Sequence, residues 1–398
     1  MGSVREVLFA PEQMADVIAR IARAETKIVS LTVTEKGYCA NVSTRELLWD
    51  HPDIANDLLH ADQPVSALGV LDAGLHERFR TYDKRGAPLT ILCCDNLAEN
   101  GVVLEALVHR FVARLHPHIV PRLRDNVSFP SSMVDRIVPA PTPQDLLDAA
   151  AVLGVEDLGV VRAEPFLQWV IEDKFATIRP AWDAVRVHFV ADVKPFEKMK
   201  LRLLNGSHSL MAYLGHFAGY ETIAQTIADP AFEQLVRALM IEAEATLAPI
   251  TDVNFTAYQQ QLIARFSNPA NGHRCAQVAM GGSQKIPLRW IAVAAERLAT
   301  GEDINAITLA TAGWIRYIDG SNELDEKIAI HDPLAATFAA ISAKHPYDAL
   351  SFADAVLRIE PVFGALGRNP AFAAPVKRFV SQLFCNGAQA TVDAFSTQ

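Results

Sequence analysis

One stretch of the sequence places polar side chains that could do chemistry within an otherwise apolar helical run. Residues 196–213 read Phe-Glu-Lys-Met-Lys-Leu-Arg-Leu-Leu-Asn-Gly-Ser-His-Ser-Leu-Met-Ala-Tyr. A lysine (Lys200), an amide (Asn205) and an imidazole (His208) in a helix expected to be buried cost free energy unless they are paired or used. These three residues are therefore candidates for a functional site.

The spacing of these residues sets a geometric condition on a shared site. His208 follows Asn205 by three residues, on the same helix face. Asn205 stands about 140° around an ideal α-helix from Lys200, so the long lysine side chain or a bend must bring them together. From periodicity alone, each residue has an alternative interpretation. Lys200 could be a surface lysine whose stem lies along the helix, and Asn205-Gly206 could mark a helix irregularity. His208 could be a core histidine whose hydrogen bonds are all made within the protein.

The composition is that of an ordinary soluble globular chain. Its 398 residues are 50% hydrophobic and 21% charged, enough for two domains with a core each. The formal net charge is −10 and no basic run occurs, which argues against a nucleic-acid or anionic-membrane surface. We expect a small-molecule partner.

Targeting, cysteine and metal signals are all weak. No apolar run approaches the roughly 20 residues of a membrane helix, and no signal peptide is recognisable, so we expect a cytoplasmic protein. His116-Pro117-His118 lacks a third ligand at useful spacing, so no metal site is predicted. Five cysteines without a Cys-x-x-Cys spacing indicate small buried side chains in a reducing compartment, namely Cys39, Cys93, Cys94, Cys275 and Cys385.

Strand and helix patterns alternate in the first part of the chain. Helical periodicity and short β-branched runs alternate as helix 11–26, strand 27–34, helix 66–83, strand 88–94 and helix 101–115. This is the pattern of a parallel doubly wound sheet, which binds ligands at the carboxyl ends of its strands. Polar residues close both strands: Thr34 and Glu35 close the first, and Asp95 and Asn96 close the second.

The second half of the chain is almost wholly helical. Apolar residues recur with a 3.6-residue period in 221–248, 252–266, 288–300, 304–317 and 348–357. We therefore predict an α/β domain over 1–194 and a helical domain over 195–398.

A Gly-rich phosphate-binding turn is absent from the expected place. No Gly-x-Gly-x-x-Gly occurs in the first hundred residues, and Gly281-Gly282-Ser283 lacks the strand and the Lys-Ser/Thr of a phosphate loop. Either the fold is not a Rossmann fold, or this sequence starts part-way into one.

Several blocks of sequence, in the same order, resemble the mannitol dehydrogenase family of long-chain polyol dehydrogenases. The resemblance runs from about residue 2 to beyond residue 320 and is carried by residues 28–39, 94–96, 133–139, 164–166, 168–173 and 200–208. It implies an incomplete Rossmann-like NAD-binding domain followed by a helical substrate domain. The family's Gly-rich amino-terminal portion is missing, which suggests a truncated or mis-started gene product or a genuine loss. Gly281 stands where the family has an aspartate.

Within the family, the sequence is most similar to the branch that interconverts D-fructuronate and D-mannonate. Thr-Glu-Lys-Gly-Tyr (34–38), Phe-Val-Ala-Asp-Val (189–193), Asn-Pro-Ala (268–270) and His-Arg (273–274) carry this similarity. It implies reversible, metal-independent hydride transfer with NAD in hexuronate catabolism. The alternatives are a mannitol or other polyol 2-dehydrogenase, and an inactive or binding-only remnant. We expect a monomer or a weak homo-oligomer.

The resemblance also implies roles for individual residues. Lys200 would exchange a proton with the substrate oxygen, because burial lowers the pKa of a lysine. Asn205 and Asn96 would donate to the alkoxide that develops, His208 would bind a neighbouring hydroxyl, and Glu197 would pass the proton to solvent.

Cofactor and substrate contacts are expected at the strand ends and in the helical domain. The candidates for cofactor binding are Thr32, Thr34, Glu35 and Asn96, and those for substrate binding are Lys36, Asp135, Arg274 and Lys285. A sugar acid needs a cation for its carboxylate, which Lys36, Arg274 or Lys285 could supply. Ordinary surface ion pairing is the alternative for these cations.

Overall fold

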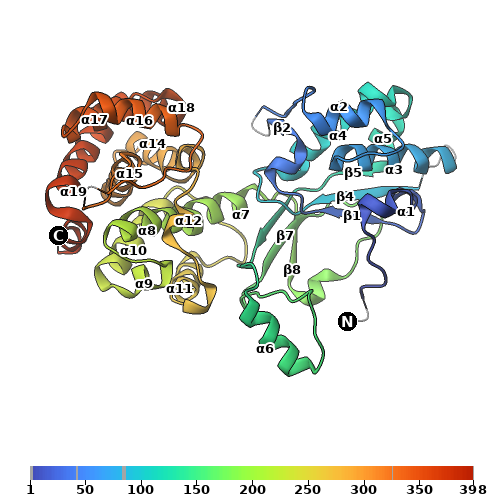
Figure 1. Ribbon diagram of the computed structural model, residues 1–398, viewed down its shortest axis with the longest axis horizontal. Helices are drawn as coiled ribbons and strands as arrows, with labels where there is room; N and C mark the ends of the chain where they lie inside the picture. Colours follow the sequence, from blue (N-terminus) through green and yellow to red (C-terminus); the bar gives the residue numbers. More distant parts are fainter. Residues whose placement is uncertain (1–2, 42–43, 83–86, 325, 398) are drawn as a thin grey trace. The chain divides into compact units, whose positions relative to one another are not determined.

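A computed structural model of the chain describes residues 3–41, 44–82, 87–324 and 326–397 (Figure 1). These residues form two compact units. The first contains Met1–Arg136 and Phe166–Glu197, and the second contains Ile137–Pro165 and Lys198–Gln398. The chain thus passes between the units after Arg136, Pro165 and Glu197, whereas the sequence predicts a single passage after residue 194.

The first unit is built on a parallel sheet, as the alternating pattern predicts. Strand β1 (Ile28–Leu31) pairs in parallel with β4 (Leu89–Cys93), which pairs in parallel with the short β5 (Val127–Ser128). Every residue of β4 is buried, because a central parallel strand is covered on both faces. The helices of this part are α1 (Ala10–Ala22), α2 (Pro52–Leu59), α3 (Ala67–Thr81), α4 (Asn100–Leu115) and α5 (Val120–Asn126).

One core joins this sheet to its helices. Ile91 of β4 packs in the same fully buried cluster as Leu75 of α3 and Leu104 and Phe111 of α4. Arg78 of α3 is also fully buried, and its guanidinium donates to the carbonyls of Ile21, Thr26, Ala87 and Pro88. Those bonds satisfy backbone acceptors that would otherwise be buried without a partner.

A second sheet of three strands and a small hairpin complete the first unit. Strand β7 (Gln168–Glu172) lies between β6 (Ser132–Asp135), which is antiparallel to it, and β8 (Val187–Val190), which is parallel. The hairpin pairs β2 (Ala40–Asn41) with β3 (Glu46–Leu47).

The second unit is helical, as predicted. Residues Ala306–Ile318 of α15 (Asn305–Ile318) are all buried, and α15 packs against α19 (Pro370–Ser396), α10 (Pro230–Glu244) and α8 (Gly206–Phe217) (Figure 1). A helix that is buried on every side lies in the middle of a helical core. The other α-helices among the described residues of this unit are α6 (Pro143–Leu153), α9 (Ile223–Ala228), α11 (Phe255–Phe266), α12 (Cys275–Val278), α13 (Gly282–Ile286), α14 (Ala292–Ala299), α16 (Ala335–Lys344), α17 (Ala349–Leu357) and α18 (Glu360–Phe363).

Two expected helices differ in detail from those observed. The run 221–248 is divided into α9 and α10, because Asp229 caps a new helix whose first residue is Pro230. The run 288–300 begins as a π-helical segment, Pro287–Ile291, before α14. Within the described ranges, no helix has the length and apolar character needed to cross a membrane.

Candidate functional site

A π-helical segment carries the lysine and the amide that the sequence singled out. Helix α7 (Lys194–Met199) is followed by the π-helical residues Lys200–Asn205 and then by α8. The N–H of Gly206 bonds to the carbonyl of Leu201, five residues back. Because a π-turn joins residues five apart, Lys200 and Asn205 stand one turn apart on the same side of the helix. The 140° separation expected for an ideal α-helix is therefore wrong here.

A second π-helical segment supports the first. In Pro287–Ile291, the guanidinium of Arg289 donates to the carbonyl of Asn205 at 3.2 Å and to the hydroxyl of Ser209 at 2.6 Å. The indole of Trp290 donates to the carbonyl of Gly206 at 3.2 Å. These three bonds hold the second π-helical segment against the junction between the first one and α8.

His208 lies buried beside the same helix turn. Its ring centroid is 4.7 Å from that of Phe266 and 5.4 Å from that of His273. Burial holds the pKa of His208 well below its usual value, and the nearby imidazole of His273 and the cations Arg289, Arg265 and Lys285 lower it further. Among the described residues, its buried Nε2 has no hydrogen-bond partner. A neutral imidazole with an unused nitrogen can accept from, or donate to, a ligand hydroxyl.

Lys285 belongs to the positive surroundings of His208, as the predicted carboxylate site requires. Burial and the neighbouring Arg289 lower the pKa of Lys285 to about 8, so it remains mostly cationic at pH 7. Its ammonium donates to the carbonyls of Val278 and Met280. Arg274, in contrast, is exposed at the start of α12.

The loop before Lys285 is ordered without the family's aspartate. Gly281 has φ 68°, a left-handed conformation that favours glycine. The carboxylate of Asp332 accepts from the backbone N–H of Ser283 at 2.8 Å and from its hydroxyl at 2.5 Å. A carboxylate from elsewhere in the chain thus holds this loop.

In the first unit, the carboxyl ends of β1 and β4 are tied together by Asp95. Its carboxylate accepts from the N–H of Val33 at 3.2 Å and of Thr34 at 2.8 Å, and from the hydroxyl of Tyr38 at 2.6 Å. The loops that would face a nucleotide are therefore fixed by one side chain. Sequence reasoning placed Asp95 at this edge but missed its role.

The other candidate residues at these strand ends differ in their exposure to solvent. Thr32, Thr34, Lys36 and Asn96 are exposed, and Asp135 is buried in β6. The side chain of Glu35 lies outside the described residues.

Sequence reasoning also missed Asn100, which fastens the strand ends. This fully buried amide at the start of α4 donates to the carbonyls of Cys93, Asp95 and Ser132, and accepts from the N–H of Ser132. The polar run Asp-Asn-Leu-Ala-Glu-Asn after β4 was its only sequence signal.

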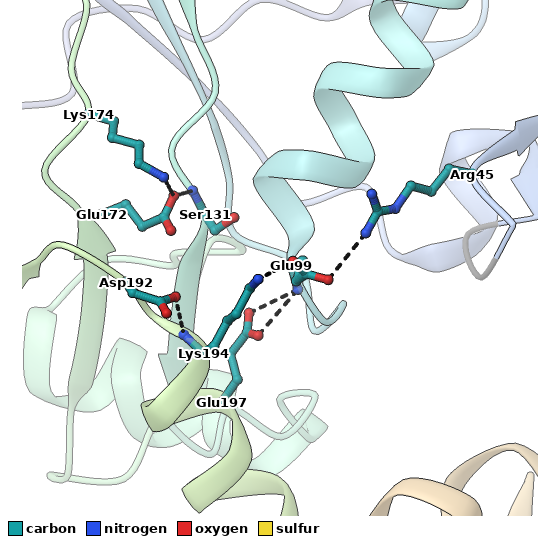
Figure 2. A network of polar contacts seen from close by, with 8 residues as sticks. All are labelled: Arg45, Glu99, Ser131, Glu172, Lys174, Asp192, Lys194 and Glu197. Atoms are coloured by element: carbon teal, nitrogen blue, oxygen red, sulfur yellow. Dashed lines mark hydrogen bonds and ion pairs between the residues drawn. The ribbon is translucent and has the colours of Figure 1, made fainter. Parts of the chain in front are cut away.

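Glu197 lies in a network of charged groups in the first unit (Figure 2). Its carboxylate accepts from the backbone N–H of Glu99 at 3.1 and 3.3 Å, at the start of α4. Burial raises the pKa of Glu197 to about 7, and the nearby acidic Glu99, Glu172 and Asp192 add to the increase, although the bond from Glu99 N–H opposes it. Glu197 can therefore take up and release a proton near neutral pH.

The charges around Glu197 are paired and line a small cavity. The Glu99 carboxylate contacts Lys194 at 2.8 Å and Arg45 at 3.2 Å, and Glu172 contacts Lys174 at 3.0 Å (Figure 2). A cavity of about 170 Å³ lies here, lined by Glu99, Val102, Ser131, Glu172, Lys174, Ala191, Asp192, Val193 and Lys194.

Family models match almost the whole chain. The mannitol dehydrogenase Rossmann domain matches residues 1–184, and the mannitol dehydrogenase C-terminal domain matches residues 192–384. The chain belongs to the mannitol dehydrogenase family. It is an oxidoreductase of that family, and the predicted combination of a Rossmann-type domain and a helical domain is confirmed.

Relatives of this mannitol dehydrogenase family member include enzymes with different named substrates. D-mannonate oxidoreductase of Escherichia coli is 42% identical over 397 residues, which cover 99% of this chain and 81% of the relative. Mannitol 2-dehydrogenase of Phaeosphaeria nodorum is 37% identical over 401 residues, covering 100% of this chain and 69% of the relative.

A solved structure gives the same comparison in three dimensions. The ternary complex of Pseudomonas fluorescens mannitol 2-dehydrogenase with NAD and D-mannitol superposes with a TM-score of 0.81 at 35% identity. The match covers 100% of this chain and 80% of that one.

Proposed function

We propose that this chain is an NAD-dependent dehydrogenase that reversibly reduces D-fructuronate to D-mannonate, with Lys200 as general acid and base and without a metal. The observation that carries the proposal is the π-turn that sets Lys200 and Asn205 on one side of a helix, with the neutral His208 and the cationic Lys285 nearby. The similarity to D-mannonate oxidoreductase supports the choice of substrate.

The strand ends of the first unit fit the nicotinamide end of the cofactor. Asp95 fixes the loops after β1 and β4, as the carboxyl edge of a nucleotide-binding sheet requires. Thr32, Thr34, Glu35 and Asn96 are the residues proposed to hold it. NAD, when bound, supplies or accepts the hydride.

The reduction of a ketone needs a proton donor and hydrogen-bond donors for the oxygen that becomes negative. Lys200 gives its proton to that oxygen in the reduction and takes it back in the oxidation. The amide of Asn205 donates to the same oxygen, and Asn96 is the second amide proposed for this role. Neither amide titrates, so both remain donors throughout the reaction.

Two further residues would handle the substrate hydroxyl and the proton. The unused Nε2 of His208 bonds a hydroxyl beside the reacting carbon, which orients the sugar chain. Glu197, three residues before Lys200 in the sequence, has a pKa near 7 and passes the proton towards solvent.

The substrate carboxylate requires a cation, which a neutral polyol does not. Lys285 is one candidate, because its surroundings are positive and it is charged at pH 7. Lys36, Arg274 and Asp135 are the other residues proposed to contact the substrate. Oxidation of mannitol or another polyol is the second candidate function, and it is favoured by the mannitol 2-dehydrogenases among the relatives.

Steady-state kinetics with the purified chain test both candidates. NADH consumption is followed with D-fructuronate and with D-fructose, and the two values of kcat/KM are compared. A higher value for fructuronate supports the proposal, and a higher value for fructose selects the polyol dehydrogenase. If neither ketose is reduced while NADH binds, the chain is a binding-only relative and the proposal fails.

A further inference from the structure

Three side chains with metal-binding atoms gather at the beginning of helix α2. The thiol of Cys39, the imidazole of His51 and a carboxylate oxygen of Asp53 lie within 4.8 Å of one another. In the sequence, Cys39 is expected to be only a small buried side chain. Its partners lie 12 and 14 residues further along, so the fold rather than a short motif brings the three together.

The backbone fixes Cys39 on one side of this group. The 3₁₀ turn Glu35–Tyr38 ends at Cys39, which has a left-handed conformation with φ 50°. The N–H of Cys39 bonds to the carbonyl of Lys36 at 3.2 Å, and its carbonyl accepts from Leu48 N–H at 3.1 Å. The thiol position is thus determined by the turn that carries Lys36 and by the adjoining hairpin.

Helix α2 fixes the other two ligands. His51 is the N-cap of α2, and its Nδ1 accepts from the N–H of Asp53 at 3.3 Å. That bond is long for an N–H donor, so a cation can take over the Nδ1 lone pair. The Asp53 N–H would then face water, as first-turn N–H groups commonly do. Both side chains are partly exposed, at 34% and 50%, which gives an ion a path of entry.

The three ligand atoms need to move only slightly closer together to bind a metal ion. Zinc has bonds of about 2.0 to 2.3 Å, so tetrahedral geometry separates its ligand atoms by about 3.3 to 3.6 Å. His51 Nδ1 and Asp53 Oδ2 are already 3.8 Å apart. All three ligand atoms lie within 4.8 Å of one another, so no pair has to close by more than about 1.5 Å.

The charges at this place also suit a cation. The carboxylates of Asp53 and Asp57 place negative charge beside the Cys39 thiol. The field that disfavours an isolated thiolate attracts a divalent ion, which then stabilises the thiolate as a ligand.

We propose that Cys39, His51 and Asp53 form a binding site for a divalent transition metal of the zinc class, with water as the fourth ligand. A thiolate, an imidazole and a carboxylate are together a ligand set that zinc and cobalt accept. Binding releases the thiol proton to solvent and involves no redox step. The ion fastens the turn that carries Lys36 to helix α2, so its role is structural and separate from the proposed hydride transfer.

Cobalt provides a direct spectroscopic test on the full chain. The chelator-treated protein is titrated with Co²⁺, and we expect one equivalent to produce the near-ultraviolet thiolate-to-cobalt charge-transfer band. Cys39→Ser should abolish the band. The matched control is Cys385→Ser, which removes an exposed thiol and should leave the band unchanged.

Two further variants separate metal binding from folding. Asparagine is a good N-cap, so His51→Asn keeps an acceptor for Asp53 N–H while it removes the imidazole. We expect His51→Asn and Asp53→Asn to fold and to bind Co²⁺ at least about tenfold more weakly. Zn²⁺ should raise the midpoint of thermal unfolding of the unmodified chain and of Cys385→Ser, but not of His51→Asn.

Either of two results would overturn the proposal. One is the absence of a charge-transfer band in the unmodified chain. The other is a band that persists in Cys39→Ser or disappears in Cys385→Ser, since that would place the metal on another thiol.

Discussion

At the scale of single residues, the central assignment is Lys200 as proton donor. We expect Lys200→Met to lower kcat by about 10² to 10⁴-fold, the usual contribution of a positioned acid or base. Lys198→Met is the matched control, because Lys198 lies two residues earlier and contacts Thr246 and Glu296 instead. Rate measurements on both variants, with NADH binding by fluorescence, check this prediction. Equal losses in the two variants would contradict the assignment.

Lys36 tests whether the substrate is a sugar acid. If its ammonium binds the carboxylate, Lys36→Met should raise KM for fructuronate by about tenfold or more, since hydrogen bonds to charged groups contribute about 1.5 to 3 kcal/mol. KM for a neutral ketose should change little. Steady-state kinetics with both substrates decide the point, and equal effects on both would remove Lys36 from the carboxylate site.

The role proposed for Lys285 predicts how KM for fructuronate depends on pH. Its pKa is lowered to about 8, so it is protonated below that pH and becomes neutral above it. If Lys285 binds the carboxylate, KM for fructuronate should rise as the pH increases through about 8. Lys285→Arg should move this rise to higher pH, because arginine stays charged. A KM that is flat between pH 7 and 9 in the unmodified chain would exclude the role.

At the scale of elements, the paired π-helical segments decide the geometry of the site. Arg289 donates to Asn205 and Ser209 from the second segment, and burial lowers its pKa to about 10. We expect Arg289→Met to reduce the free energy of unfolding by about 1 to 3 kcal/mol, because the part-buried carbonyl of Asn205 and the buried hydroxyl of Ser209 lose their donor. It should also reduce kcat, since the π-turn positions Lys200 and Asn205.

A surface arginine provides the comparison for Arg289. Arg237 pairs with Glu233 within α10, and both side chains are well exposed. Arg237→Met should change the free energy of unfolding by no more than about 1 kcal/mol and leave kcat unaltered. Urea denaturation and rate measurements on both variants check the pair. If Arg289→Met loses stability but keeps full kcat, the π-turn does not position the site.

Local sequence rules predicted the elements well where local signals dominate. The strands at 27–34 and 88–94 and the helices at 66–83 and 101–115 were found because the periodicity of apolar residues acts within a few residues. The π-turn could not be found in this way. Its donors, Arg289 and Trp290, lie more than 80 residues away in the sequence.

At the scale of the whole molecule, the segment Ile137–Pro165 shows how the chain passes between units. It belongs to the helical unit, where the buried Glu164 accepts from Arg265 at 2.8 and 3.0 Å. Glu164 also binds the backbone of Ile137, through its own N–H at 3.1 Å and its carboxylate at 2.7 Å. Glu164 thus joins the end of the segment to its beginning at Ile137, and its ion pair with Arg265 joins both to helix α11.

The ion pair gives a prediction for the stability of the helical unit. Arg265→Met removes the two charge-assisted hydrogen bonds that the buried Glu164 accepts from the guanidinium, so we expect a loss of about 3 to 5 kcal/mol in the free energy of unfolding. Limited proteolysis should then cut first within 137–165. The double variant Glu164→Gln with Arg265→Met should recover part of the loss, because the buried carboxylate charge is removed together with the arginine. A double variant as unstable as the single one would show that packing, rather than charge, is decisive.

The sequence by itself determined the residue types and their approximate setting. Apolar periodicity, the polar ends of two strands and the lysine, amide and histidine in an apolar helix are local properties, so they could be read directly. The resemblance identified the family from the order of such blocks. The tertiary structure alone decided the π-turn that aligns Lys200 with Asn205 and the cations around His208. It also decided the meeting of Cys39 with His51 and Asp53. The cations around His208 and the donors to the π-turn come from distant segments, and Cys39 meets residues 12 and 14 positions further along, so none of these contacts has a period or motif in the sequence.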